Sequence, residues 1–159
     1  MSDNKRPKKL VPLRHPEDGY LLSDFLPALL VKLTNTWNKR FHQDLKKHDI
    51  SVPRWRVLSV VCSRRGISIK EIAAFSTVEQ PNASRIVDQF VLEGRMTRQV
   101  SDEDGRAVVI RSTEKGQALF QEIWPVALAS YRKNAAPLTS REEATMVRLL
   151  RKLLDAAIA

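Results

Sequence analysis

Apolar residues recur at steps of three and four through several long stretches of this chain, which is the spacing of one face of an α-helix. The first stretch predicts a helix over about 21–48, with Asp24 as its cap and Pro27 in its first turn. A second helix is expected between Ser51 and Gly66, because serine caps helix starts and glycine ends helices. The apolar stripe of the first helix consists of Leu26, Leu29, Leu30, Leu33, Trp37, Phe41 and Leu45.

Two further helices are predicted close together, joined by a short turn. Ser68 and Glu71 have the S-x-x-E spacing of a capping box, which fixes the start of the third helix. The fourth helix spans about 80–93 and ends at Gly94. The third is expected to bury Ile69, Ile72, Ala73 and Phe75, and the fourth to bury Ala83, Ile86, Val87, Phe90 and Val91. The outward face of the fourth helix then consists of Gln80, Pro81, Asn82, Ser84, Arg85, Asp88 and Gln89.

The pattern changes to β-branched residues after the fourth helix. Segments 96–101 and 106–111 contain the runs MTRQV and RAVVI, which predict two strands. The Asp-Gly dipeptide at 104–105 is a hairpin signal between them. A helix-turn-helix followed by a β-ribbon wing is a device for reading DNA, so we expect a DNA-binding region over 51–113.

The rest of the chain returns to helical spacing. Thr113 is expected to cap a fifth helix, in which Pro125 removes a backbone donor and predicts a kink or a break. Thr139 and Glu142 form a second capping box at the start of the final helix. Together the elements predict a mainly α fold with a small β-wing, in one compact domain.

Composition adds a partner class to this picture. The net charge of +9 and pI near 10.1 favour a polyanion, although the same charge can serve solubility alone. Residues 1–20 form a basic arm that is expected to be flexible, either solvated or in contact with phosphate. Cys62 is the one cysteine and is expected to be an inert buried thiol. With no signal core and no membrane-length apolar run, we expect a cytoplasmic, nucleoid-associated protein.

Motifs of metal binding and catalysis are missing from the sequence. His15, His42 and His48 are scattered, with no cysteine or carboxylate at metal-ligand spacing. There is no glycine-rich phosphate loop and no nucleophile elbow. We therefore expect no metal, no cofactor and no enzyme activity.

Side-chain chemistry on the fourth helix and the wing fits contacts with double-stranded DNA. Asparagine and glutamine can bond adenine and arginine can bond guanine, which suits Gln80, Asn82 and Arg85 to base edges. Ser84 suits a nearby phosphate. The alternative to a DNA-binding role is that these residues form an ordinary solvated face of the fourth helix. The predicted DNA-binding residues are Gln80, Pro81, Asn82, Ser84, Arg85, Arg98, Asp104 and Arg106.

The predicted DNA-binding residues that do not lie on the fourth helix lie on the wing. Arg106 at the hairpin tip can enter a narrow minor groove, where the negative potential is deepest. Asp104 can pair with Arg106 and orient it, while Arg98 and Arg111 suit the DNA backbone. An ordinary surface ion pair at a turn is the alternative reading of Asp104 and Arg106.

With these motifs in place, the chain from about Leu21 onward resembles the MarR family of bacterial transcriptional regulators. The resemblance is carried by SRIVDQF, LEG, the DEDGRAVVI wing and STEKG. It implies a homodimer in which segments 21–50 and 114–159 are dimerisation helices. Two recognition helices would then meet a pseudo-palindromic operator. Arg95, Ser112 and Gly105 depart from the family's usual residues, and Gly105 puts the strength of the wing contact in question.

The resemblance also implies repression relieved by a small ligand, often an aromatic acid. Trp37, Phe41 and Trp55 lie on helices that would wall the ligand cleft, and Arg40 or Arg56 could neutralise a carboxylate there. Plain core packing is the alternative for these aromatic residues. Two other functions stay open from the sequence: a ligand-independent architectural DNA-binding protein, and a winged-helix module that binds another protein.

Overall fold

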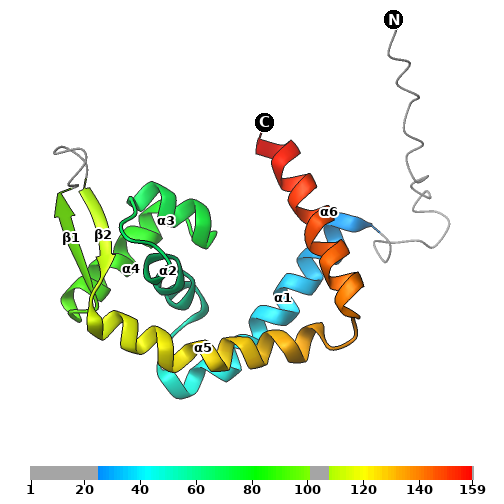
Figure 1. Ribbon diagram of the computed structural model, residues 1–159, viewed down its shortest axis with the longest axis horizontal. Helices are drawn as coiled ribbons and strands as arrows, with labels where there is room; N and C mark the ends of the chain where they lie inside the picture. Colours follow the sequence, from blue (N-terminus) through cyan, green and yellow to red (C-terminus); the bar gives the residue numbers. More distant parts are fainter. Residues whose placement is uncertain (1–24, 101–107, 159) are drawn as a thin grey trace, which may run out of the picture. The chain divides into compact units, whose positions relative to one another are not determined.

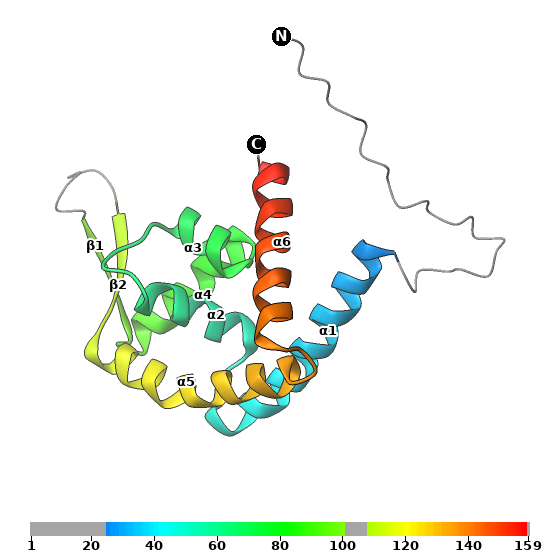
Figure 2. The same cartoon turned by 45° about the vertical axis from the view of Figure 1, so that its right-hand side comes forward.

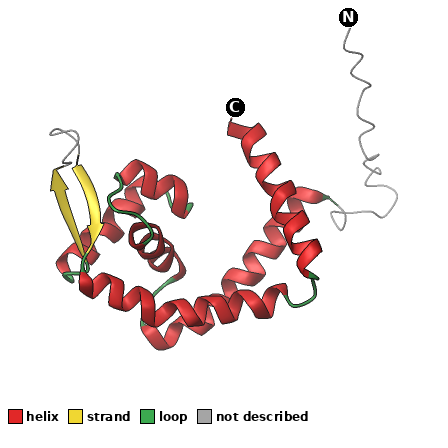
Figure 3. Ribbon diagram, viewed as in Figure 1, coloured by secondary structure: helices red, strands yellow, loops and turns green. Residues whose placement is uncertain are grey.

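Six α-helices and a two-stranded antiparallel sheet make up residues 25–100 and 108–158, the part of the chain that the computed structural model describes (Figures 1 and 3). The chain divides into two units within the first helix, with the boundary between Trp37 and Asn38. This architecture confirms the predicted mainly α fold with a β-wing. The elements are α1 (Leu26–Leu45), η2 (a 3-10 turn, Lys46–His48), α2 (Val52–Cys62), α3 (Ile69–Ser76), α4 (Gln80–Leu92), β1 (Met96–Val100), β2 (Val108–Ser112), α5 (Glu114–Ala135) and α6 (Ser140–Ile158).

Four helices, α2, α3, α5 and α6, begin at the predicted caps, whereas the predicted Asp24 cap lies outside the described residues. The Ser51 hydroxyl accepts from the Arg54 backbone N–H at 3.5 Å, and the Thr113 hydroxyl accepts from the Gly116 N–H at 3.2 Å. Ser68 and Glu71 form both bonds of a capping box, as predicted. The second predicted box is also present, since the Thr139 N–H and hydroxyl both donate to the Glu142 carboxylate at 2.8 Å. Local side-chain chemistry therefore determines where these helices start.

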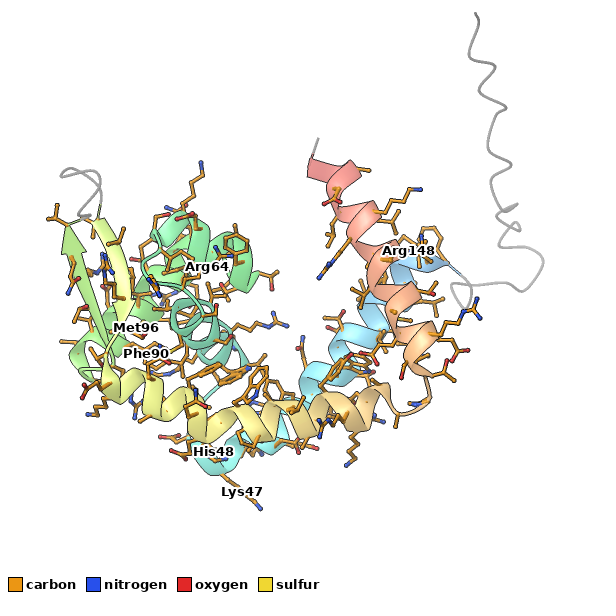
Figure 4. The ribbon with its side chains drawn as sticks, viewed as in Figure 1. Lys47, His48, Arg64, Phe90, Met96 and Arg148 are labelled. Carbon is orange, nitrogen blue, oxygen red and sulfur yellow. The ribbon has the colours of Figure 1, made fainter. Side chains whose placement is uncertain are left out.

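The core of the second unit lies where α2, α3, α4 and the wing pack together. Its largest fully buried side chains include Phe90, Leu58, Met96 and Ile110, and Figure 4 shows Phe90 and Met96 where α4 meets the wing. The strands pair from Met96 opposite Ser112 to Val100 opposite Val108, and they run side by side in both views of the ribbon (Figure 2). A β-bridge from Ile67 to Ile110 ties the wing to the start of α3. The wing is therefore anchored to the helix-turn-helix.

Phe75 is not buried, so the prediction for this residue was wrong. Its side chain is 55% exposed, and the Arg64 guanidinium lies 4.0 Å from the centre of its ring. Ser76 is buried instead, at 2% exposure. A four-residue step from Ile72 leads to Ser76, so the inner face of α3 is completed there and Phe75 lies at its edge.

The fifth helix does not break at Pro125, so the prediction of a break there was wrong. α5 is continuous from Glu114 to Ala135 with Pro125 inside it. Pro125 and Gln121 are both exposed. The carbonyl of Gln121 can therefore bond to water in place of the missing N–H, which makes the proline tolerable on this face.

Candidate nucleic-acid interface

The apolar face of α4 is anchored in the core. Ala83, Ile86, Val87 and Phe90 are buried, as the spacing of apolar residues predicted. α4 starts with Gln80 and Pro81, where a proline costs no helix hydrogen bond. The residues between these apolar positions consequently point away from the core.

The first two turns of α4 carry polar side chains that are free to bind a partner. Gln80, Pro81 and Arg85 are exposed, while Asn82 and Ser84 are half-buried. Among the residues that the structure describes, Gln80, Asn82 and Arg85 have no side-chain hydrogen bond and no ion pair. The predicted base-contacting groups thus lie together on one helix with their donors and acceptors unused.

The last turns of α4 differ, because their polar groups are already bonded. Arg98 on β1 donates to the Asp88 carboxylate at 2.5 Å. Arg54 on α2 donates to Gln89 at 3.0 Å and to Glu93 at 2.6 Å. These contacts attach the C-terminal half of α4 to both neighbouring elements, whereas the polar side chains of its first two turns have no such bonds with other described residues.

Arg54 is a structural residue that the sequence did not reveal. Its guanidinium lies 4.5 Å from the centre of the Phe90 ring as well as bonding Glu93. The other carboxylate oxygen of Glu93 accepts from Arg95 at 2.6 Å. An acidic group at a helix C-terminus is unfavourable by itself, and the two arginines offset that charge. Since Arg54 and Glu93 are 39 positions apart, no local pattern could have predicted the pair.

The wing is described only up to its tip. Arg98 is exposed on β1, and Arg111 on β2 donates to the Arg65 carbonyl at 2.5 Å. The predicted pair Asp104 and Arg106 lies outside the described residues. The described wing therefore contributes Arg98, next to α4.

Four aromatic rings form a connected group between α1, α2 and α5. Phe41 meets Trp55 edge-on with ring centres 6.4 Å apart, and Trp55 stacks on Phe120 at 5.5 Å with nearly parallel planes. Phe120 in turn lies 5.7 Å from Trp124. The structure thus brings the predicted Phe41 and Trp55 together. Phe120 and Trp124 were missed, although their four-residue spacing on one helix was a usable signal.

The predicted arginines Arg40 and Arg56 both bond neutral partners. Arg40 donates to the Asn134 side-chain oxygen at 2.9 Å. Arg56 donates to Asn38 and to the Thr77 hydroxyl, each at 3.0 Å. Neither forms a salt bridge within residues 25–100 and 108–158. Trp37, the fifth predicted ligand residue, is half-buried and is the last residue of the first unit.

The described part of the chain has few groups suited to catalysis or metal binding. Burial raises the pKa of the Cys62 thiol to about 11, against an opposing hydrogen bond with Ser112, so the thiol stays protonated at neutral pH. Its Sγ lies 3.7 Å from the Gly116 carbonyl oxygen. Among these residues there is no cluster of His, Cys, Asp or Glu suited to a metal ion. None of their helices has the length and apolar character that crossing a membrane requires.

Comparisons with known proteins agree with this geometry. A model of the MarR family matches residues 50–108, which include the helix-turn-helix and the first strand. The HTH-type transcriptional repressor IacR of Pseudomonas putida is 29% identical over 84% of this chain and 80% of its own length. The homoprotocatechuate degradative operon repressor of Escherichia coli is 20% identical over 84% of this chain and 90% of its own length.

A solved structure extends the similarity to nearly the whole chain. A MarR family transcriptional regulator from Silicibacter pomeroyi superposes with a TM-score of 0.81 and 26% identity, over 95% of this chain and 99% of that one. The residues that the family model matches include α4 with its unbonded polar turns and the first strand of the wing. Residues 50–108 thus match the MarR family model, and nearly the whole chain has the fold of a MarR family transcriptional regulator.

Proposed function

We propose that this protein is a repressor that binds a pseudo-palindromic operator as a homodimer and is released by an aromatic acid. The observation that carries the DNA-binding part is the free polar surface of α4. Gln80, Asn82 and Arg85 lie on its first two turns without a protein partner, where a major-groove helix meets base edges. Two relatives are named as repressors, which supports the direction of control.

The surface of α6 supports the homodimer. Large apolar side chains on this helix are exposed, among them Leu149, Leu153 and Leu154. Contiguous apolar surface on a folded chain usually marks an interface, and a symmetric partner is the simplest way to cover it. In this proposal residues 21–50 and 114–159 form the dimer, and residues 51–113 bind DNA in the bacterial cytoplasm at the nucleoid.

The aromatic group and the two arginines support an anionic aromatic effector. Trp55 and Phe120 offer ring faces, and Arg40 and Arg56 carry positive charge without a carboxylate partner in the described residues. A carboxylate would give either guanidinium a stronger, charge-assisted hydrogen bond than its present neutral partners do. One relative is named for the operon of homoprotocatechuate degradation, and homoprotocatechuate is an aromatic acid.

The test is a titration of the purified protein against a duplex from its own promoter and against a scrambled duplex, at two salt concentrations. Preferential binding with two chains per duplex supports the proposal, and homoprotocatechuate added to the same assay should lower the affinity. Binding that is equal on both duplexes and driven only by salt contradicts it. Asn82→Ala should lose about 1–3 kcal/mol at one base pair, whereas an equal loss on every sequence would rule out base reading.

A further inference from the structure

The turn between α3 and α4 contains a residue in an unfavourable backbone conformation. Thr77 follows α3 directly and has φ 53° and ψ 35°, in the left-handed region. This region suits glycine, whereas a β-branched residue is strained there. Gln80, the first residue of α4, lies three positions later. The conformation of Thr77 therefore sets the direction in which the recognition helix starts.

Three hydrogen bonds hold Thr77 in place. Its backbone N–H donates to the Ala73 carbonyl, and its hydroxyl donates to the Ser76 carbonyl at 2.7 Å. The hydroxyl oxygen also accepts from the Arg56 guanidinium at 3.0 Å. The first two bonds join Thr77 to the end of α3, which it follows directly. The bond from Arg56 is the one that ties Thr77 to another helix.

Arg56 is shared between this turn and α1. While one guanidinium nitrogen donates to Thr77, the other donates to the Asn38 side-chain oxygen at 3.0 Å. Arg56 is half-buried on α2, next to Trp55 of the aromatic group. Both of its acceptors are neutral, so a carboxylate in the same place would compete for the guanidinium with a stronger bond.

We propose that Arg56 is a positioning residue that holds the Thr77 turn in its left-handed conformation, and that an aromatic carboxylate capturing Arg56 releases this turn. The release would change the direction of α4 and lower operator affinity. An effector can shift such an equilibrium only through a contact that differs between the two states, and the bond from Arg56 to Thr77 is that contact. The effector half of this inference rests on the proposed function.

A double-mutant cycle on the full chain tests the positioning role without DNA or ligand. The readout is the hydrogen-exchange rate of the Val78 amide, which donates to the Ala73 carbonyl at 3.3 Å across the turn. Arg56→Gln should speed this exchange at least fivefold. Thr77→Gly adopts the left-handed conformation without support, so adding Arg56→Gln to it should change the rate less than twofold. Equal acceleration in both backgrounds would overturn the proposal.

Two further variants distinguish a specific effect on the turn from a general loss of structure. If Arg56→Gln folds poorly, Thr77→Val takes its place. It leaves Arg56 intact but removes the acceptor of the Arg56 bond together with the hydroxyl bond to the Ser76 carbonyl, so it should speed Val78 exchange at least fivefold. An unchanged rate in Thr77→Val would overturn the proposal. Arg64→Gln is the charge-matched control, because Arg64 contacts α3 through the Phe75 ring and not through the turn (Figure 4 labels Arg64). It should leave Val78 exchange within twofold of the wild type, and a larger effect would show that any arginine loss loosens the turn.

Homoprotocatechuate tests the effector half. In the wild type it should speed Val78 exchange as Arg56→Gln does, and in Arg56→Gln it should add nothing. If it binds and still acts in Arg56→Gln, the release mechanism is wrong. If it has no effect on the wild type, the aromatic-acid part of the proposed function fails for this compound, and the ligand-free cycle still decides the positioning role.

Discussion

At the scale of single residues, Gly116 is held in a space that admits no side chain. It is buried in the first turn of α5, and a Cβ atom added there would lie 2.1 Å from the Arg95 carbonyl oxygen. The same carbonyl accepts from the Thr113 N–H at 3.0 Å, so it cannot move away without loss. Gly116→Ala should therefore destabilise the fold by about 1–3 kcal/mol, measured by urea unfolding.

Gly94 offers a matched control for that prediction. It has φ 69°, and nothing lies within 4 Å of the place where its Cβ would be. Gly94→Ala should therefore cost only the backbone preference, about 1 kcal/mol. If Gly116→Ala is no more harmful than Gly94→Ala, the close approach of α5 to Arg95 does not constrain the fold.

Asp88 is the acidic residue on the proposed DNA-binding face of α4. Its ion pair with Arg98 is open to solvent, with side chains 55% and 38% exposed, so it should contribute less than about 1 kcal/mol to stability. Asp88→Ala removes a negative charge and frees Arg98 for phosphate. Affinity should rise several-fold on operator and scrambled duplex alike, with a steeper salt dependence. A fall in affinity would instead mean that Asp88 orients Arg98 for its DNA contact.

At the scale of elements, the two capping boxes make helix stability depend on pH. The Ser68 hydroxyl and then its backbone N–H lower the pKa of Glu71, and the Thr139 N–H and then its hydroxyl lower the pKa of Glu142. Because each folded-state pKa lies below the unfolded one, the stabilisation is complete above the unfolded pKa. It is lost as pH falls through the folded pKa, and hence below about pH 4.3.

Removing both carboxylates should flatten this part of the pH profile. We expect the urea midpoint of the wild type to fall more steeply between pH 5 and pH 3 than that of Glu71→Gln with Glu142→Gln. Glu114→Gln is the control, since Glu114 lies in the first turn of α5 and its side chain has no hydrogen bond with a described residue. Parallel pH profiles for the double variant and the wild type would contradict the assigned role of the boxes.

Elements with local signals could be predicted from the sequence, and those that depend on distant contacts could not. Ser51, Ser68 and Thr113 begin helices through bonds to residues three positions away, so their role is visible in the sequence. The break expected at Pro125 does not occur, and the sequence could not exclude it, because the cost of the proline depends on whether the carbonyl of Gln121 reaches water.

The residues of the candidate site also fall into those that the sequence predicts and those that only the fold reveals. Gln80, Asn82 and Arg85 were found by subtracting the apolar stripe of α4, an operation that needs no tertiary structure. The bonds of Arg54 to Glu93 and of Arg56 to Thr77 join positions 39 and 21 residues apart. Nothing in the spacing of either arginine reveals its partner, because packing of separate helices creates the pair.

At the scale of the whole molecule, the exposed apolar side of α6 should determine the oligomeric state. Leu153 is 51% exposed and Leu154 is 60% exposed, and both would be covered in the proposed dimer. Burying a leucine contributes about 1.5–3 kcal/mol. Since a two-fold interface contains each residue twice, losing Leu154 removes at least about 3 kcal/mol, or roughly a hundredfold in the dissociation constant.

Leu154→Lys should therefore make the protein monomeric at micromolar concentration in sedimentation velocity. The variant should keep its helical circular dichroism, because the substituted side chain is exposed in the single chain. Lys152→Ala, on the same helix and also exposed, should leave the sedimentation coefficient unchanged. Operator binding by Leu154→Lys should lose its two-to-one stoichiometry and weaken, because the half-sites are then bound independently. A variant that stays dimeric would place the subunit contact away from this side of α6.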